Sequence, residues 1–322
     1  METIQPATFS FVQLLKADPS RCEGCRIEGM DALRYGAERF RHDVGTAIFA
    51  RIAGPDGEEV RSRIHDTPGP RWFAPDRPIR TVHADASMFV GGLSALLLQT
   101  LHPLAMAAVA EHSAYRSSPW GRLQRTSTFL ATTTYGTAAD AHAAVERVRA
   151  VHAGVHGIAP DGRRYDATDP HLLEWVHLAE IRCFLAAYRR YGAEPLTAEQ
   201  ENGYVTDTAR VARALGVAAP PTDVAGLERR FAEFHAELSA TPAAREAVRY
   251  LVLDPPLPLV VRPAYLGLSL AAVGLLPWWA RVALGLPLPM PVRASAPVAG
   301  HLLVRGIRWA TRPPERSEPS ET

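Results

Sequence analysis

A long apolar helix is the sequence feature that most constrains the fold of this chain. Residues Ala86 to Leu101 are almost all apolar and carry no charge, and Pro103 ends the run. A helix that is apolar on every side is stable only when other elements surround it. The sequence therefore predicts that Ala86 to Leu101 forms a central helix covered by the rest of the chain.

Helical periodicity and helix-boundary residues predict further helices along most of the sequence. The expected helices span residues 10–17, 29–52, 105–113, 122–134, 138–155, 170–191, 198–215, 223–240 and 243–253. A loop is expected over residues 157–170, and few segments show the period-two alternation that is typical of strands. The fold class is thus predicted as all-α, a single large helical domain with extra N- and C-terminal helices.

Composition agrees with a packed core and excludes several functions. Of 322 residues, 47% are hydrophobic and 21% are charged, and the formal net charge is +1, so binding of nucleic acid by a basic surface is not expected. Only one of the 35 basic residues is a lysine, Lys16, which argues against lysine-based chemistry. The glycine-rich motifs that bind phosphate groups are absent from the sequence.

Changes in composition divide the chain into four expected regions. These are an N-terminal helical extension with a proline-rich linker (1–74), a core (75–254), apolar C-terminal helices that pack on the core (255–312) and a disordered tail (313–322). The 18 residues from Pro263 to Ala280 carry no charge, which is close to the length of a membrane span. Because Pro277 interrupts them, we expect a helical hairpin over residues 263–286 that is buried or contacts a membrane peripherally, with a true span as the alternative. The N-terminus shows no secretory signal, so a cytoplasmic location is expected, with membrane association left open.

Two short motifs are weak signs of a metal site. Cys22 and Cys25 form a lone CxxC pair, which is half of a zinc site, a redox pair, or two incidental cysteines of a reduced intracellular chain. Glu174 and His177 form a single ExxH element, whereas di-iron helical bundles need two copies.

Histidine points more directly to chemistry, and the chain has 12 histidines. His152 and His156 lie four residues apart on one predicted helix, so their side chains are expected to share a face. Such a pair binds a metal ion when further ligands are present, and one histidine that faces an apolar cavity can bind haem iron. A helical histidine with no ligand at all is the structural alternative.

The segment from Arg122 to Thr128 is the second unusual feature. It places Arg122, Arg125 and Thr126 on about one side of a predicted helix beside apolar residues. Arginines in such a place need partners, because a buried unpaired charge is costly. Haem propionates or a bound oxygen species would serve, and so would Glu111 or Asp140.

Several motifs, in the same order along the chain, resemble one family. They are LLLQTLHPLAMAAVAEHSAYRSSPWGRLQRTSTFLATTTYGT, VRAVHAGVHG, YDATDPHLLEWVH and LLPWWARVALGLP. This pattern resembles the DUF2236 or MpaB-type family, which includes the latex-clearing rubber oxygenases and the fungal oxygenase of mycophenolic acid biosynthesis, and the match covers residues 75–290. The resemblance implies a globin-like core with haem b, activation of dioxygen, and cleavage of a carbon–carbon double bond in an isoprenoid chain.

The resemblance also implies roles for individual residues. The axial histidine of the rubber oxygenases follows an Arg-x-x-Lys-Thr motif, which gives this role to His152, with His156 as the second candidate. Arg122 and Thr126 match the arginine and threonine of the motif, and Arg125 stands where those enzymes have lysine. Since arginine stays protonated and is not a usual iron ligand, we expect an open or water-occupied distal position with Arg125 as a hydrogen-bond donor.

The sequence therefore predicts a haem b-dependent oxygenase that uses dioxygen to oxidise or cleave a small apolar, isoprenoid-like substrate. Arg122, Arg125 and Thr126 would polarise the bound oxygen or hold the haem propionates, and residues 266–276 would contact the substrate. We expect the nearby residues His102, Glu111 and His112 to pack helices and support the site. The alternatives are a haem-binding protein without oxygenase turnover, a cofactor-free helical relative in which no porphyrin-sized cavity adjoins the histidine, and a membrane-associated scaffold.

Overall fold

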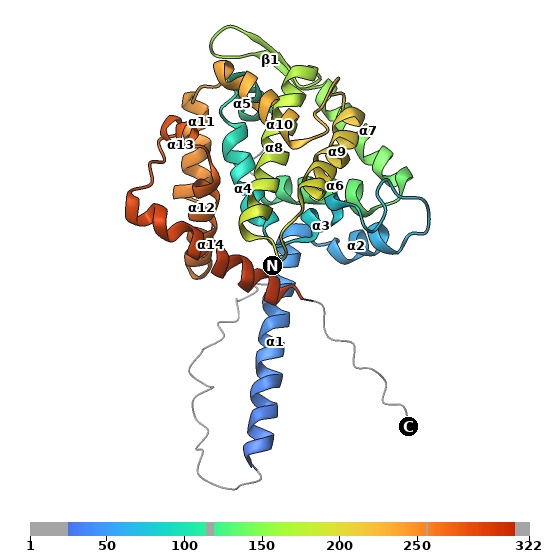
Figure 1. Ribbon diagram of the computed structural model, residues 1–322, viewed down its shortest axis with the longest axis vertical. Helices are drawn as coiled ribbons and strands as arrows, with labels where there is room; N and C mark the ends of the chain where they lie inside the picture. Colours follow the sequence, from blue (N-terminus) through green and yellow to red (C-terminus); the bar gives the residue numbers. More distant parts are fainter. Residues whose placement is uncertain (1–24, 114–118, 256, 313–322) are drawn as a thin grey trace, which may run out of the picture. The chain divides into compact units, whose positions relative to one another are not determined.

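The computed structural model describes residues 25–113, 119–255 and 257–312, and most of them lie in helices (Figure 1). Contacts between residues divide the chain into two units, Met1–Asp43 and Val44–Thr322. Helix α1 (Cys25–Ala53) begins in the first unit and ends in the second. The predicted helix at 10–17, the predicted tail at 313–322 and Cys22 lie outside the described residues.

The described part of the chain contains fourteen α-helices and one short hairpin, so the prediction of an all-α fold is confirmed. After α1, the helices up to the hairpin are α2 (Gly57–Asp66), α3 (Pro78–Ala84), α4 (Met88–Gln99), α5 (Pro103–His112), α6 (Pro119–Tyr135) and α7 (Ala138–Ala153). The hairpin strands β1 (His156–Ile158) and β2 (Arg164–Asp166) lead into α8 (Pro170–Tyr191), α9 (Ala198–Leu215), α10 (Val224–Glu233), the 3₁₀ turn η2 (Phe234–Glu237), α11 (Pro242–Val248), α12 (Arg262–Leu275), α13 (Trp278–Ala283) and α14 (Met290–Ala310).

Helix α4 lies in the core of the second unit, as its apolar sequence predicts. It packs against α8, and its Leu97 and Leu98 are completely shielded from solvent (Figure 1). Trp175 and Leu178 of α8 are equally buried, and the Trp175 indole N–H donates to the Gln99 carbonyl at the end of α4. The burial of apolar surface stabilises this contact by about 25 cal/mol per Å². Helix α8 is therefore held along its length, which fixes the positions of the polar side chains that it carries.

The apolar stretch near the C-terminus forms two helices rather than one. Helix α12 packs against α4 and α14, and its Ala271 and Ala272 are fully buried. Pro277 separates it from the short helix α13, so the proline interrupts the apolar stretch as expected. In the described residues, no single helix has both the length and the apolar character that a membrane crossing needs, although α3 and α4, bent by 93° at their junction, meet the criteria together.

A β-hairpin occupies residues 156–166, where the sequence analysis expected a loop. Gly162 in its turn has a φ of +85°, a left-handed conformation that suits glycine. Gly157 lies opposite Tyr165, and a Cβ atom at position 157 would lie only 2.5 Å from the Tyr165 hydroxyl. The hairpin depends on these two glycines and on one tyrosine, which a search for alternating apolar residues does not detect.

Helices α2 and α3 also lie outside the predicted helices, whereas α14 lies within residues 255–312, where C-terminal helices are expected. Helix α14 contains Pro297 in its interior, and a proline there removes a backbone hydrogen bond and normally argues against a helix. Helix α3 is only seven residues long and begins at Pro78, within the proline-rich segment. Packing within the second unit therefore overrides the local preference at these positions.

Candidate functional site

His152 lies on the inward-facing side of α7, near the end of this helix. Thr137 caps the start of α7, where its Oγ1 accepts the Asp140 N–H at 3.1 Å. Ala141, Val145 and His152 share a stripe of α7 that is wholly or partly buried, whereas the residues on either side of His152 are exposed. The stripe points toward the neighbouring helices α6 and α9, so His152 continues the core side of α7.

The protonation state of His152 suits a ligand role. Burial lowers the pKa of this imidazole below its usual value, so the ring is neutral at pH 7. Within the described residues, neither ring nitrogen has a hydrogen-bond partner. A neutral imidazole with a free nitrogen is the form that binds haem iron or a metal ion.

The prediction that His156 shares a helix face with His152 is wrong. Helix α7 ends at Ala153, Gly154 caps it, and His156 is the first residue of strand β1 with its side chain exposed. The backbone changes from helical to extended between the two histidines, so the four-residue spacing does not bring them together. This arrangement favours His152 over His156 as the axial ligand.

The arginine motif lies on α6, which packs against α7. Arg122 is half-buried and donates to the Ser113 hydroxyl at 2.9 Å. Arg125 and Thr126 are exposed, so Arg125 carries no buried charge that needs a protein partner.

The two carboxylates that the sequence analysis considered as partners for this motif bind other groups. Asp140 accepts from Arg63 at 3.0 Å and from the Thr137 hydroxyl at 2.8 Å. Glu111 accepts the Tyr165 hydroxyl, and His112 Nε2 lies 3.0 Å from the same hydroxyl oxygen. These contacts join α5 to β2, which agrees with the supporting role expected for Glu111 and His112.

Helix α8 carries two further ionisable groups that are partly buried, His177 and Glu180. The His177 Nε2 atom is buried and has no hydrogen-bond partner among the described residues, and burial lowers the pKa of this histidine to about 4. Burial raises the pKa of the Glu180 carboxyl to about 7. The carboxyl can therefore be protonated or ionised at physiological pH, which suits a group that gives or takes a proton.

A second interior histidine, His83 of α3, lies close to this part of α8. Its Nδ1 is 2.9 Å from the Thr134 hydroxyl and its Nε2 is 3.4 Å from the Tyr204 hydroxyl, and its ring makes an edge contact with Phe184. Burial lowers the pKa of His83 to about 3, so the ring is neutral. The sequence analysis missed His83 and Glu180, because each is a single polar residue in a helix with no motif around it.

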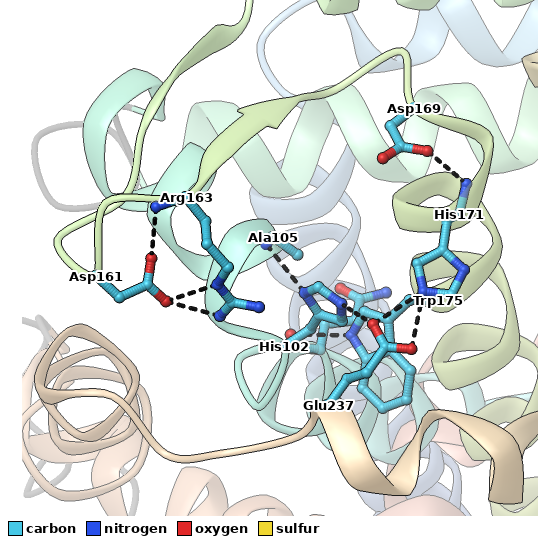
Figure 2. Close-up of polar contacts among 9 residues, drawn as sticks. His102, Ala105, Asp161, Arg163, Asp169, His171, Trp175 and Glu237 are labelled. Atoms are coloured by element: carbon cyan, nitrogen blue, oxygen red, sulfur yellow. Dashed lines mark hydrogen bonds and ion pairs between the residues drawn. The ribbon is translucent and has the colours of Figure 1, made fainter.

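A separate group of ionisable side chains forms where three segments meet (Figure 2). His102 precedes α5, His171 lies in the first turn of α8, and Glu237 ends η2. His171 Nε2 lies 2.9 Å from one carboxylate oxygen of Glu237, and His102 Nε2 lies 3.4 Å from the same oxygen. We call these three residues the His–His–Glu cluster. Sequence reasoning treated His102 as a packing residue and did not single out Glu237, because nothing in the sequence brings the three positions together.

Two surface hollows among the described residues do not contain the predicted site residues. One hollow is lined by residues of α2 between Glu58 and Asp66, and another lies between α8, α10 and α13 and is lined in part by Arg182 and Trp279. Neither includes His152 or the arginine motif of α6. A haem protein and a cofactor-free relative differ in whether they bind a porphyrin. The optical spectrum described under the proposed function distinguishes these two alternatives.

The fold and these side chains limit the class of protein to which the chain can belong. An all-α protein with a neutral, unpartnered histidine on an inward helix face is suited to hold a haem group or a metal ion. The chain belongs to the family described as ER-bound oxygenase mpaB/B′/rubber oxygenase, catalytic domain, whose model matches residues 80–309. The predicted family is thus confirmed, and the chain is an oxidoreductase of an oxygenase family. We found no match among curated proteins and none among solved structures.

Proposed function

We propose that this protein is a haem b-dependent oxygenase that oxidises or cleaves an apolar substrate with dioxygen. The observation that carries the proposal is His152, a neutral histidine without a hydrogen-bond partner in the described chain, on the inward face of a helix in an oxygenase catalytic domain. A bound haem supplies the iron at which dioxygen is activated. His152 would hold the iron through one ring nitrogen, and the packing of α7 against α6 and α9 holds the helix that carries it.

The arginine motif would act on charge rather than on the metal. Arg122 is half-buried, so its guanidinium can bind a carboxylate such as a haem propionate more strongly than an arginine in bulk water can. Arg125 remains protonated and donates hydrogen bonds without ligating iron. Thr126 lies one turn from Arg122 on the same helix and offers a hydroxyl to the same region.

An optical spectrum tests the cofactor directly. We expect a Soret band that shifts when dithionite and carbon monoxide are added, and we expect His152→Ala to lose it. His156→Ala is the matched control, since His156 is exposed on a strand and should leave the band unchanged. Absence of a Soret band in the wild-type protein, even after expression with added haem, would contradict the proposal. Loss of the band in His156→Ala alone would move the ligand role to His156.

The C-terminal helices favour peripheral contact with an anionic membrane, which is also the source of an apolar substrate. Residues 255–312 contain six arginines and neither aspartate nor glutamate, although Asp85 pairs with one of the six, Arg308, at 2.8 Å. The same region exposes large apolar side chains, among them Leu266, Trp278 and Leu302. Exposed apolar residues beside basic ones are typical of proteins that bind the surface of an anionic bilayer. We propose that α12 to α14 make this contact.

Vesicle flotation tests the membrane contact. The protein should float with vesicles that contain phosphatidylserine. With vesicles of phosphatidylcholine alone it should stay at the bottom of the gradient while the vesicles rise. Trp278→Ser should weaken flotation with the phosphatidylserine vesicles. Val151→Ser removes an equally exposed apolar side chain from α7 and should have no effect. Equal behaviour on both kinds of vesicle, or in both variants, would refute this contact.

A further inference from the structure

The His–His–Glu cluster brings three potential metal ligands to one point. One ligand atom from each of His102, His171 and Glu237 lies within 4.8 Å of the others. Figure 2 shows the Glu237 carboxylate between the two imidazole rings, which come from the segment before α5 and from the start of α8. None of these residues belongs to α6 or α7, so the cluster is separate from the elements that carry His152 and the arginine motif.

His102 gives independent evidence that a ligand is missing. Its side chain is 1% exposed, and its Nε2 atom is buried without a hydrogen-bond partner in the described part of the chain. The Glu237 oxygen lies 3.4 Å from this nitrogen, a distance that allows charge attraction but is long for a hydrogen bond. A buried polar atom without a partner is costly and rare, so it needs an explanation. An atom that binds Nε2 between the three side chains would supply it.

We propose that His102, His171 and Glu237 bind a divalent transition metal ion of the zinc class through two Nε2 atoms and one carboxylate. Two histidines and one carboxylate are a donor set that zinc accepts, with one position left for water. In a tetrahedral zinc site with bonds of about 2.0 to 2.2 Å, neighbouring ligand atoms are about 3.4 Å apart. The two nitrogen–oxygen separations of 2.9 Å and 3.4 Å are close to this value, and all three ligand atoms lie within 4.8 Å of one another, so side-chain movements can bring them onto one ion.

The surroundings allow a cation to enter and stay. The side chains of His171 and Glu237 are 46% and 40% exposed, so one side of the cluster is open to solvent, and a water molecule can take the remaining position there. Arg163 is a nearby positive charge (Figure 2), and Asp161 balances it at 2.7 Å. The Glu237 carboxylate is thus available to the incoming ion.

Metal binding would change one backbone contact in a measurable way. At present His102 Nδ1 accepts the Ala105 N–H at 3.4 Å, a long hydrogen bond that caps α5. When Nε2 binds a metal ion, the ring proton must sit on Nδ1, and two N–H groups then face each other. Zinc should therefore weaken this cap and shift the NMR signal of the Ala105 amide.

Calorimetric titration of the full-length protein with Zn²⁺, after treatment with a chelator, tests the proposal. The Cys22→Ser/Cys25→Ser variant serves as the starting protein, since free thiolates also bind zinc. We expect one zinc ion per chain at this site and a rise in melting temperature on addition of zinc. Glu237→Gln and His171→Asn should each weaken binding by more than about 100-fold, beyond the 10- to 100-fold that loss of a supporting residue costs.

His235→Asn is the matched control, because His235 is an exposed histidine of the same turn η2 outside the cluster. It should bind zinc as tightly as the starting protein. The Ala105 amide signal should move with zinc in the control and stay in place in Glu237→Gln. No zinc binding by the starting protein would overturn the proposal, and so would equal binding by Glu237→Gln, His171→Asn and the control. Since Glu237 and His171 are exposed, their variants are expected to fold, which circular dichroism checks.

Discussion

Glu180→Gln should make the protein more stable at high pH and leave it almost unchanged in acid. Burial raises the pKa of Glu180 from 4.5 to about 7, so the folded state keeps this carboxyl protonated at pH values where the unfolded chain ionises it. Between these two values the folded state binds more protons than the unfolded state, and the free energy of unfolding therefore falls as the pH rises. Glutamine has nearly the same shape as glutamate and does not ionise. The Glu180→Gln variant therefore does not lose stability through ionisation at this position as the pH rises.

The magnitude follows from the two pKa values. At about 1.36 kcal/mol per pH unit, the loss in the wild-type protein is about 0.8 kcal/mol at pH 5 and about 3 kcal/mol at pH 8. The advantage of Glu180→Gln over the wild-type protein should thus grow by about 2 to 3 kcal/mol between these pH values. No described residue pairs with the carboxyl, so the variant loses no ion pair that would offset the gain.

Urea unfolding at pH 5 and pH 8 measures this difference. Glu199→Gln is the control, because Glu199 is exposed on α9, and its effect should be small and nearly the same at both pH values. Suppose that Glu180→Gln changes the free energy of unfolding by the same amount at pH 5 and pH 8. Burial then does not raise the pKa of Glu180 in the folded state, and this prediction is refuted.

Three further predictions follow from the same structure. Leu98→Ala should lower the free energy of unfolding by about 3 to 5 kcal/mol, since Leu98 is fully buried in α4, whereas Leu266→Ala at a 57% exposed position should cost about 1 kcal/mol or less in the same urea assay. Asp207→Asn should cost about 3 kcal/mol or more, because the nearly buried carboxylate pairs with Arg77 and also accepts a backbone N–H at the start of α3; an effect below 1 kcal/mol would show that this pair is dispensable. Arg125→Lys should change the optical spectrum of the haem-loaded protein, because a lysine amine can ligate iron once it loses its proton, and an unchanged spectrum would place residue 125 away from the haem.

The sequence predicts the helices well where hydrophobic periodicity and boundary residues agree. Helices α8 and α9 match the predicted ranges because each begins with a capping residue, Asp169 or Thr197, and ends before a glycine. The hairpin at 156–166 could not be predicted from periodicity, since its strands have three residues each. Helix α14 lies in a region that is expected to be helical, but its bounds could not be predicted, because a proline lies inside it.

The candidate site is predictable only in part. The role of His152 follows from family resemblance, and the structure adds its inward position and its neutral state. The prediction that His156 lies on the same helix as His152 is wrong, because α7 ends before Gly154, which lies between the two histidines. Glu180 and Glu237 carry no local signal at all, since their environment is made by elements that are distant in the sequence.

The His–His–Glu cluster also has a consequence for the order of folding. His171 and Glu237 are separated by 66 residues, and between them the chain forms α8, α9, α10 and η2. Loops of this length close slowly, and their ends meet only after the intervening helices have docked. The cluster should therefore assemble late, so an ion bound there would distinguish chains that have completed their tertiary structure from those that have only formed their helices.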